Sequence, residues 1–417
     1  AADFFYSDEN KIDARGRGYD LFLKPEWSPE RLRAQNYLNH LSVLRAELVR
    51  EVGGFREGFD GSQDHDLFLR VTEKARQVVH IPAVLYHWRP VAGSAAAQID
   101  AKPYAWDAGL RAVQEHLQRV GVQGEALKGP QPGTYELRYR PDPSWKVSVI
   151  VPTRGSSGTV WGERRVFVVE MVRSLLAKAG NVEVEVVVVH DLSTPDRVLE
   201  QLREIAGERL ILVPFKWPFN FAAKCNVGFI HSTGDVVVLL NDDMEIIADR
   251  FLELLVGPLQ ERSVGMTGAR LLFEDGTIQH AGMMFSQAKL FWHPHYQEPD
   301  TSTGTFGSLI VNREASGLTG ACVALRREVY KEVGGLNEDL PVNFNDVDFS
   351  MKVAFLGYRR LWLSNATAFH FESQTRVAHV QRWEIDFILQ RWALPRDDPY
   401  LPELAYDQVV RNDLKGD

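Results

Sequence analysis

The second half of the chain alternates between short apolar runs and longer amphipathic stretches. The runs are rich in β-branched and aliphatic residues, and they span residues 147–151, 182–189, 209–215 and 236–240. Runs of this kind are typical of strands that are covered on both faces. Between the first two, apolar residues recur at fourfold spacing over residues 167–179, which predicts a helix. Alternating strands and helices predict an α/β fold with a mostly parallel sheet and right-handed crossovers.

Polar residues follow three of these predicted strands. They are Pro152 and Thr153 after the first run, His190 and Asp191 after the second, and Asn241, Asp242 and Asp243 after the fourth. Ligands of such sheets bind beyond the carboxyl ends of the strands. The convergence of three strands therefore predicts a polar ligand site at this edge of the sheet.

An internal repeat divides the chain. Residues 41–55 match residues 322–336, and further positions pair at a nearly constant offset: Leu44 with Leu325, Asp66 with Asp348, and His87 with His370. So long a match indicates a duplication. The first copy holds only the later half of the module, because no runs like those between residues 147 and 241 precede it.

This repeat predicts the domain organisation. We expect a partial module at residues 1–125, a Gly- and Pro-rich linker at 126–144, a complete domain at 145–405 and a tail at 406–417. The chain begins inside what reads as mid-domain sequence and without Met, so we expect it to be part of a longer protein.

Composition narrows the range of functions. The 417 residues carry a net charge of −9, which argues against a broad nucleic-acid surface. The two cysteines, Cys225 and Cys322, have no metal-ligand spacing, and a reducing cytoplasm fits them. No apolar run approaches the roughly 20 residues of a transmembrane helix. We therefore expect a cytoplasmic protein, with peripheral attachment at the inner face of the plasma membrane as the alternative.

The ordered motifs of the second copy resemble the family 2 glycosyltransferases, inverting enzymes of the GT-A fold, and most closely the bacterial rhamnosyl- or O-antigen-type branch. The segments that carry the resemblance are VSVIVPTRG from Val147, PFNFAAKCN from Pro218, VVVLLNDDME from Val236, TGACVALRREVYKEVGGLNE from Thr319, NDVDFS from Asn345 and FHFES from Phe369. The resemblance implies transfer of a sugar from a UDP- or dTDP-activated donor to a hydroxyl of a cell-surface glycan or lipid-linked acceptor. It also implies Mn²⁺ or Mg²⁺ as cofactor and no nucleic-acid partner.

In this resemblance Asn241–Asp243 corresponds to the DXD motif of the family. Asp243 is the expected metal ligand, with His370 as a further ligand, while Asn241 or Asp242 contacts the donor ribose. Carboxylates suit a divalent cation that neutralises a diphosphate. The alternatives are a solvated turn after a strand and a structural histidine.

Other residues resemble donor contacts of the family. Thr153, with Pro152 before it, and Asp191 correspond to contacts with the nucleotide base and ribose. Asn220 and Lys224 belong to a further motif, in which the helix near Phe221 points its first amides at the diphosphate. The alternative is that Asn220 only caps this helix. Glu372, Ser373 and Arg376 correspond to further diphosphate contacts.

The resemblance makes Asp346 the general base. It would accept the proton of the acceptor hydroxyl as the oxygen attacks the anomeric carbon. Asn345 stands where the family has Glu, and Gly320 corresponds to a backbone position near the acceptor. Asp348 has two interpretations, an acceptor-side residue or a cap of the helix that follows it.

Several alternatives stay open. Asp64, Asp66 and His87 of the first copy mirror the later acidic and histidine positions without a preceding DXD strand. The aromatic residues of 383–392 fit either a membrane surface or packing onto their own domain. PTRGSSGTVWGERR resembles the phosphate loop of a sugar nucleotidyltransferase. A degenerate donor- or glycan-binding scaffold module is the non-enzymatic alternative.

Overall fold

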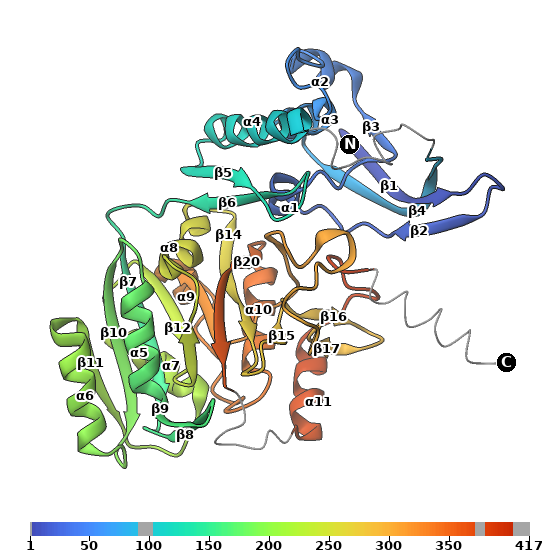
Figure 1. Cartoon of the computed structure of the whole chain (residues 1–417). Coiled ribbons are helices and arrows are strands. Elements are labelled where there is room, and N and C mark those ends of the chain that lie inside the picture. The colour runs from blue at the N-terminus through green and yellow to red at the C-terminus, as the bar shows by residue number, and fades with distance from the viewer. Residues whose placement is uncertain (1, 91–102, 372–379, 403–417) are drawn as a thin grey trace. The chain divides into compact units, whose positions relative to one another are not determined.

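The structure is a computed structural model that describes residues 2–90, 103–371 and 380–402. It divides into two compact units (Figure 1). Unit 1 comprises Ala1–Arg138, Thr303–Glu314 and Asp397–Asp417, and unit 2 comprises Tyr139–Ser302 and Ala315–Arg396. The main boundary lies within the segment that we predicted to be a linker.

Unit 2 is built on one large sheet. Its strands lie in the order β11 (Leu210–Phe215), β10 (Glu183–Asp191), β7 (Lys146–Thr153), β12 (Val236–Leu240), β19 (Cys322–Arg326), β14 (Val264–Leu272), β20 (Arg359–His370) and β13 (Met244–Ile246). The first four strands are parallel, as predicted, and so is the pair β14 and β20. β19 and β13 run antiparallel to their neighbours, a direction that hydrophobic runs alone do not encode.

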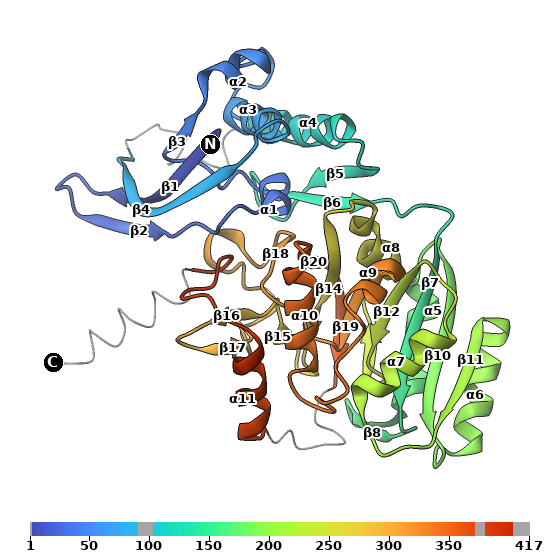
Figure 2. The same cartoon turned by 180° about the vertical axis from the view of Figure 1, so that it is seen from behind.

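Helices cover both faces of this sheet. α5 lies in front of the strands in Figure 1, and α7 lies on the opposite face in Figure 2. The helices of unit 2 are α5 (Phe167–Lys178), α6 (Asp196–Ala206), α7 (Phe221–His231), α8 (Phe251–Val256), α9 (Arg327–Glu332), α10 (Asn345–Phe355) and α11 (Arg382–Arg391), with 3₁₀ turns η3 (Gly207–Arg209) and η4 (Gly257–Gln260). The smaller strands are the pair β8 (Ser157–Val160) and β9 (Glu163–Val166), β15 (Ile278–His280) beside β14, and the pair β16 (Met284–Ser286) and β17 (Leu290–Trp292). The predicted α/β class is confirmed.

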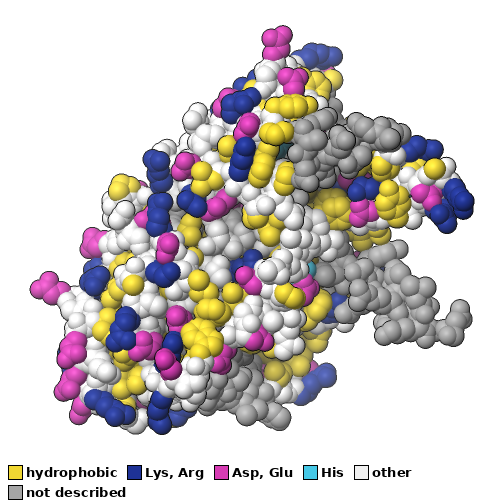
Figure 3. Space-filling view, in the orientation of Figure 1, with side chains coloured by type: hydrophobic (Ala, Val, Ile, Leu, Met, Phe, Trp, Pro, Cys, Tyr) yellow, Lys and Arg dark blue, Asp and Glu magenta, His cyan; other side chains and the backbone are white. Residues whose placement is uncertain are grey.

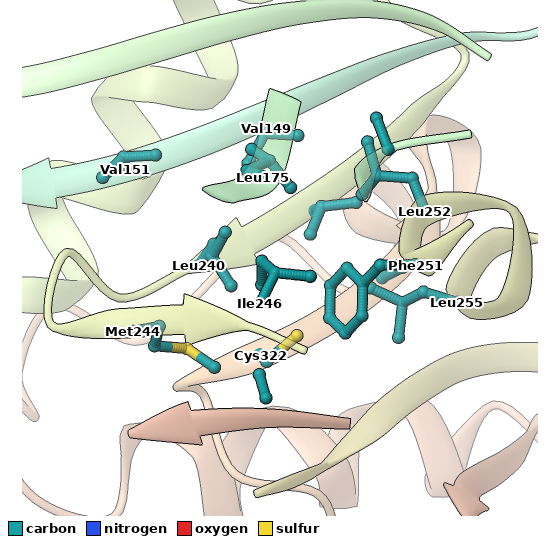
Figure 4. Packing of buried hydrophobic residues seen from close by; sticks show 14 of the residues in the cluster. Val149, Val151, Leu175, Leu240, Met244, Ile246, Phe251, Leu252, Leu255 and Cys322 are labelled. Carbon is teal, nitrogen blue, oxygen red and sulfur yellow. The ribbon is translucent and has the colours of Figure 1, made fainter. Parts of the chain in front are cut away.

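The main core lies between this sheet and helices α5 and α8. Figure 4 shows Leu175 of α5 and Phe251 and Leu255 of α8 among the side chains of the strands, including Val149 and Leu240. All five side chains are fully buried. Burying an aliphatic or aromatic side chain of this size contributes roughly 1.5–3 kcal/mol. The packing of this core therefore fixes the positions of the strand ends that carry the polar residues.

Unit 1 has a smaller sheet. β1 pairs antiparallel with β2 and β3 and parallel with β4. The elements of unit 1 are β1 (Phe4–Ile12), β2 (Gly18–Phe22), α1 (Pro29–Ala34), β3 (Ser42–Leu44), α2 (Ala46–Glu51), α3 (Gln63–Thr72), β4 (Val78–Trp88), α4 (Pro103–Arg119), β5 (Gly124–Lys128), β6 (Tyr135–Tyr139), η5 (Thr305–Gly307) and β18 (Arg313–Glu314).

The segment predicted as a linker contains paired strands. β5 and β6 form a two-stranded sheet, with the Gly- and Pro-rich residues 129–133 between them. Tyr135, Leu137 and Tyr139 alternate along β6, and all three are buried. This alternation, which the Gly and Pro content obscured, is the pattern of a strand with one packed face.

Charges of both signs mix on the visible surface of unit 2. Lysine and arginine side chains are interspersed with aspartate and glutamate on the face shown in Figure 3. Within the described residues, no helix is both long and apolar enough to cross a membrane.

The aromatic residues near the C-terminus pack largely onto unit 2. Ile388 of α11 is fully buried, and Phe387 and Trp392 lie against the same small core. The indole Nε1 of Trp392 donates to Asp348 at 2.8 Å, while Trp383 is half exposed. These contacts favour packing onto the domain over a membrane-facing stripe. The predicted tail at 406–417 and the predicted diphosphate contacts Glu372, Ser373 and Arg376 lie outside the described residues.

Candidate active site

A cavity of about 360 Å³ opens at the carboxyl ends of β7 and β12. Its volume lies within the range of small-molecule sites. It brings together most of the predicted site residues: Pro152, Thr153, Asn241, Asp242, Asp243, Gly320, Asn345, Asp346 and His370. These residues come from five separate stretches of unit 2, as expected of a site beyond the ends of parallel strands.

Asp243 and His370 meet in this cavity because β13 pairs with the end of β20. The Nε2 atom of His370 lies 3.2 Å from Oδ1 of Asp243 and 3.1 Å from the amide nitrogen of Asn241. Oδ1 of Asn241 is buried and has no hydrogen-bond partner. Burial opposes ionisation of Asp243, but the neighbouring imidazole outweighs it and lowers the pKa of Asp243.

Asp242 is held on the other side of the motif. Its Oδ2 accepts a hydrogen bond from the hydroxyl of Thr153 at 2.5 Å. Burial raises the pKa of Asp242, and the charge of Asp243 raises it further, against the smaller opposing effects of Thr153 and Lys224. The two adjacent carboxylates are largely shielded from water, so their negative charges repel each other strongly. A divalent cation beside them would stabilise both in the ionised form.

The chemistry of this donor set fits a hard divalent cation. Asp243 and His370 supply a carboxylate oxygen and an imidazole nitrogen, and the unpartnered oxygen of Asn241 lies beside them. Across the described ranges, no group of three His, Cys, Asp or Glu side chains is placed to hold a metal. The protein would therefore supply few ligands. Mg²⁺ in particular is commonly held by one or two carboxylates together with water and substrate phosphates.

Sequence reasoning missed the role of one residue next to this pair. Gln279 of β15 is buried, and its Oε1 lies 2.6 Å from Nδ1 of His370. An Nδ1–H that donates to Gln279 fixes the ring with Nε2 facing Asp243 and Asn241, where the neutral imidazole would offer its Nε2 lone pair to a bound cation. Partners of this kind set the tautomer and orientation of metal-binding histidines.

Asp346 lines the same cavity from the first turn of α10. Its carboxylate accepts hydrogen bonds from the backbone N–H of Gly320 at 3.1 Å and from its own neighbour Val347 at 2.9 Å. A Cβ atom added to Gly320 would lie 3.4 Å from Cβ of Asp346, so the backbone passes close to the carboxylate. Asn345 is buried and donates to the carbonyl of Val342 at 2.9 Å.

A second cavity, of about 390 Å³, shares Arg154 and Phe219 with the first. It is lined by Asp191, whose carboxylate forms an ion pair with the fully buried amine of Lys224. That amine also donates to the carbonyl of Thr153 at 2.7 Å. Lys224 thus connects the ends of β7 and β10 and does not line either cavity.

Arg154 was missed by sequence reasoning. Its side chain is largely exposed, and its Nε lies 3.6 Å from a carboxylate oxygen of Asp191. A guanidinium at the edge of both cavities suits an anionic ligand that extends from one to the other. Its position directly after Thr153, at the end of a buried strand, could have identified it as a site residue.

Asn220 does not line either cavity. Its side chain caps α7 by accepting from the N–H of Ala223 at 2.9 Å, and its amide donates to the carbonyl of Glu338 at 2.8 Å. The N–H of Phe221 donates to Pro341 at 2.8 Å. Two of the first amides of this helix are thus occupied within the protein, which disfavours the predicted diphosphate contact.

Asp348 also lies outside the cavities. It is fully buried in α10 and accepts from Trp392, while Arg391 and Lys352 lie 2.9 and 3.4 Å from its carboxylate. Its partners tie α10 to α11, so the structure places Asp348 in the framework and not on the acceptor side.

The acidic and histidine positions of the first copy have structural partners of their own. Asp64 accepts from the side chain of Asn39, and Asp66 forms ion pairs with Arg56 and Arg70. Nδ1 of His87 lies 2.6 Å from the side-chain oxygen of Asn10. The three side chains therefore do not form one site.

The stretch that resembled a phosphate loop folds as the β8–β9 hairpin. Trp161 occupies its turn and packs edge-on against Phe369 and Phe371, with ring centroids 5.1 and 5.3 Å away. A Gly-rich phosphate loop would instead lead from a strand directly into a helix N-terminus. This geometry argues against the nucleotidyltransferase alternative.

Comparison with known proteins bears on this site. The family model described as glycosyl transferase family 2 matches residues 148–334. These residues form a family 2 glycosyltransferase domain. The match begins in β7 and ends just beyond α9, so it includes Thr153, Asp243 and Gly320, while Asp346 and His370 follow it. The GT-A type of α/β architecture expected for this family agrees with the sheet of unit 2.

Two curated relatives align with nearly the whole chain. The uncharacterized protein y4gI of Sinorhizobium fredii is 38% identical over 429 residues, which is 99% of this chain and 46% of that protein. The O-antigen biosynthesis protein RfbC of Myxococcus xanthus is 35% identical over 400 residues, which is 95% of this chain and 31% of that protein. The chain therefore spans less than half the length of both relatives.

Two solved glycosyltransferase structures resemble the fold more weakly. GalNAc-T7 with UDP, GalNAc and Mn²⁺ has a TM-score of 0.44 at 15% identity, covering 57% of this chain and 45% of that chain. The mannosyltransferase PcManGT from Pyrobaculum calidifontis, in complex with GDP-Man and Mn²⁺, has a TM-score of 0.40 at 21% identity, covering 57% of this chain and 60% of that chain. The assignment of the domain rests on the family match and the curated relatives.

Proposed function

We propose that the family 2 domain is a metal-dependent inverting glycosyltransferase. It would move a sugar from a UDP- or dTDP-linked donor to a hydroxyl of a cell-surface glycan or a lipid-linked acceptor. The observation that carries this proposal is one cavity that contains both the Asp243–His370 pair and the carboxylate of Asp346. The relative named for O-antigen biosynthesis supports a glycan acceptor.

Asp346 would act as the general base. Its carboxylate is positioned by backbone N–H groups, so it can accept a proton without a side-chain partner having to move away. The acceptor hydroxyl would lose its proton to Asp346 while its oxygen forms a bond to the anomeric carbon. The bond from that carbon to the diphosphate oxygen breaks on the opposite side, so the configuration inverts.

The remaining polar residues would hold the leaving group. Asp243 and His370 would bind Mn²⁺ or Mg²⁺, which supplies positive charge to the departing diphosphate. The guanidinium of Arg154 places a positive charge at the entrance to the second cavity. That cavity is lined by Asp191 and by the exposed aromatic side chains of Trp217 and Phe219. An aromatic ring stacks on a nucleobase regardless of its hydrogen-bonding edge. We infer that the base occupies this second cavity.

Thermal unfolding with nucleotides tests this proposal. UDP, dTDP and GDP would each be added with and without Mn²⁺, because a ligand that binds only the native state raises the unfolding temperature by mass action. At about 100 times the dissociation constant, the stabilisation is about 2.7 kcal/mol. We expect a shift of several degrees with UDP or dTDP that requires Mn²⁺. If none of the three nucleotides shifts the transition, the proposed donor site is wrong.

Substitution of Gln279 tests the metal site by a separate readout. We expect Gln279→Leu to weaken Mn²⁺ binding, measured by calorimetry, by about 10–100-fold, because His370 loses the partner that orients its ring. Gln279→Glu keeps an oxygen acceptor and should retain most of the affinity. Gln260→Leu is the matched control, since that amide donates to the carbonyls of Arg140 and Gly257 away from the cavity. Equal Mn²⁺ affinity in Gln279→Leu and Gln260→Leu would contradict this role.

A further inference from the structure

Unit 1 repeats the element order of the second half of unit 2. Apart from inserted elements, β14, β15, β19, α9, α10 and β20 correspond to β1, β2, β3, α2, α3 and β4. The pairing agrees as well, since β14 and β1 each lie antiparallel to two of these strands and parallel to the last. The sequence repeat spans β19–α9 and β3–α2, so the two sets can be compared position by position.

The two sets differ in what covers them. In unit 2, β19 pairs on its second side with β12, and α7 packs beside α9. Both β12 and α7 belong to the first half of the family 2 domain, which we call the donor half and define as residues 146–260. In unit 1, the pairing of β3 within the described residues is with β1 only. No donor half is present on this side of β3 in the described parts of unit 1.

Residues at corresponding positions on the two strands differ in exposure. Cys322 and Ala324 of β19 are 1% and 0% exposed, because they lie in the core that β12 shares with α5 and α8. Their counterparts in the repeat, Leu41 and Val43, are 40% and 53% exposed. Unit 1 thus exposes a leucine and a valine to solvent at the two positions where unit 2 buries a cysteine and an alanine.

The helical part of the repeat shows the same difference. Leu336 is 3% exposed, and its backbone N–H and C=O both bind the side-chain amide of Asn226 in α7. Its counterpart Phe55 is 67% exposed. Tyr330 of α9 is also covered by α7, where it stacks on Phe229 with ring centroids 4.3 Å apart.

We propose that Leu41, Val43, Phe55 and the edge of β3 that is unpaired within the described residues are a docking site for the donor half of a family 2 module. The partner would add an antiparallel strand to β3, as β12 does to β19, and would place a helix with an amide side chain over Phe55. Main-chain hydrogen bonds would supply register, and the three apolar side chains would supply burial. The aligned region is less than half of each relative, so both relatives contain further sequence outside it.

In unit 2 the repeated segment β19–α9 is covered by a donor half, so a segment with this backbone can be covered in that way. The donor half buries all three counterparts in unit 2, since Cys322 and Ala324 lie in the core with α5 and α8 and Leu336 is hydrogen-bonded to Asn226 of α7. Leu41, Val43 and Phe55 are therefore not a scatter of single surface residues, which would need no explanation. The inference concerns unit 1, so it stands whether or not unit 2 transfers a sugar.

Thiol labelling of the full chain tests the first part of the proposal. The native Cys225 and Cys322 are buried, so an introduced thiol dominates the signal. We expect Phe55→Cys to react at least about 10-fold faster than the matched variant Leu336→Cys, because the second position needs local opening to react. Equally slow labelling would mean that another segment of the chain covers Phe55, and slowing at higher protein concentration would mean that a second copy does. Either result overturns the proposal.

A fused donor half tests the second part. Residues 139–262 would be placed a second time ahead of Ala1 in the full chain, and we expect labelling of Phe55→Cys to fall at least about 10-fold while Leu336→Cys is unchanged. Adding Val43→Glu should restore the labelling, since it buries a charge at the strand contact. Labelling that stays fast in the fusion, or protection that survives Val43→Glu, overturns the proposal.

Discussion

Replacing Asp346 by Asn is expected to lower the rate of sugar transfer about 10²–10⁴-fold. The amide has the shape of the carboxylate and can still accept the N–H of Gly320, but it cannot take a proton from the acceptor hydroxyl. Because the residue contacts no part of the motif that holds the cation, the Mn²⁺-dependent shift with nucleotide should persist. The measurement is release of the nucleoside diphosphate, with the nucleotide chosen from the thermal shifts.

Asp339→Asn serves as the control for this substitution. Asp339 is exposed, precedes α10 by a few residues and does not line the cavity. It should transfer sugar at the parent rate. If Asp346→Asn transfers sugar as fast as Asp339→Asn, Asp346 is not the base, even where donor binding is intact.

Replacing Asp243 by Ala is expected to abolish the part of nucleotide binding that depends on Mn²⁺ and to lower the transfer rate about 10²–10³-fold. A cation that neutralises a leaving diphosphate contributes several kcal/mol, and each 1.36 kcal/mol is a factor of ten in rate. His370 would remain in place through Gln279, but alone it is a weak site for a hard cation. Calorimetry with Mn²⁺ and thermal unfolding with nucleotide would measure the loss.

The matched control is Asp235→Ala, at the opposite end of β12. Asp235 accepts a hydrogen bond from the N–H of Lys146 at 3.0 Å and lies outside the cavity, so Mn²⁺ binding should be unchanged.

Replacing Asp243 by Ala also affects Asp242. The charge of Asp243 contributes to the raised pKa of Asp242, so this pKa should fall in Asp243→Ala. An Mn²⁺-dependent nucleotide shift of parent size in Asp243→Ala would remove this residue from the metal site.

Much of the site could be predicted because it lies at the ends of strands. A continuous apolar run forms a buried strand, and polar residues directly after it emerge at one edge of a parallel sheet. Thr153, Asp242 and Asp243 were found in this way. For Asn220 and Asp348 the sequence left two interpretations, since an N-cap and a ligand contact draw on the same residue types. Asn220 caps α7 by accepting from Ala223, as its structural interpretation predicted. Asp348 lies inside α10 and accepts from Trp392, so its predicted role as a cap of that helix was wrong.

The sequence by itself determined the α/β class, the repeat and the order of the motifs, because periodicity and local spacing are properties of neighbouring residues. Tertiary structure alone decided which distant residues meet. The pairing of β13 with β20 brings His370 to Asp243, the placement of β15 brings Gln279 to His370, and the close approach of the backbone at Gly320 holds Asp346. The exposure of Val43 and Phe55 was equally hidden, because the repeat has the same pattern whether or not a donor half covers it. Burial depends on what packs against a residue, and that partner can lie anywhere in the chain or outside it.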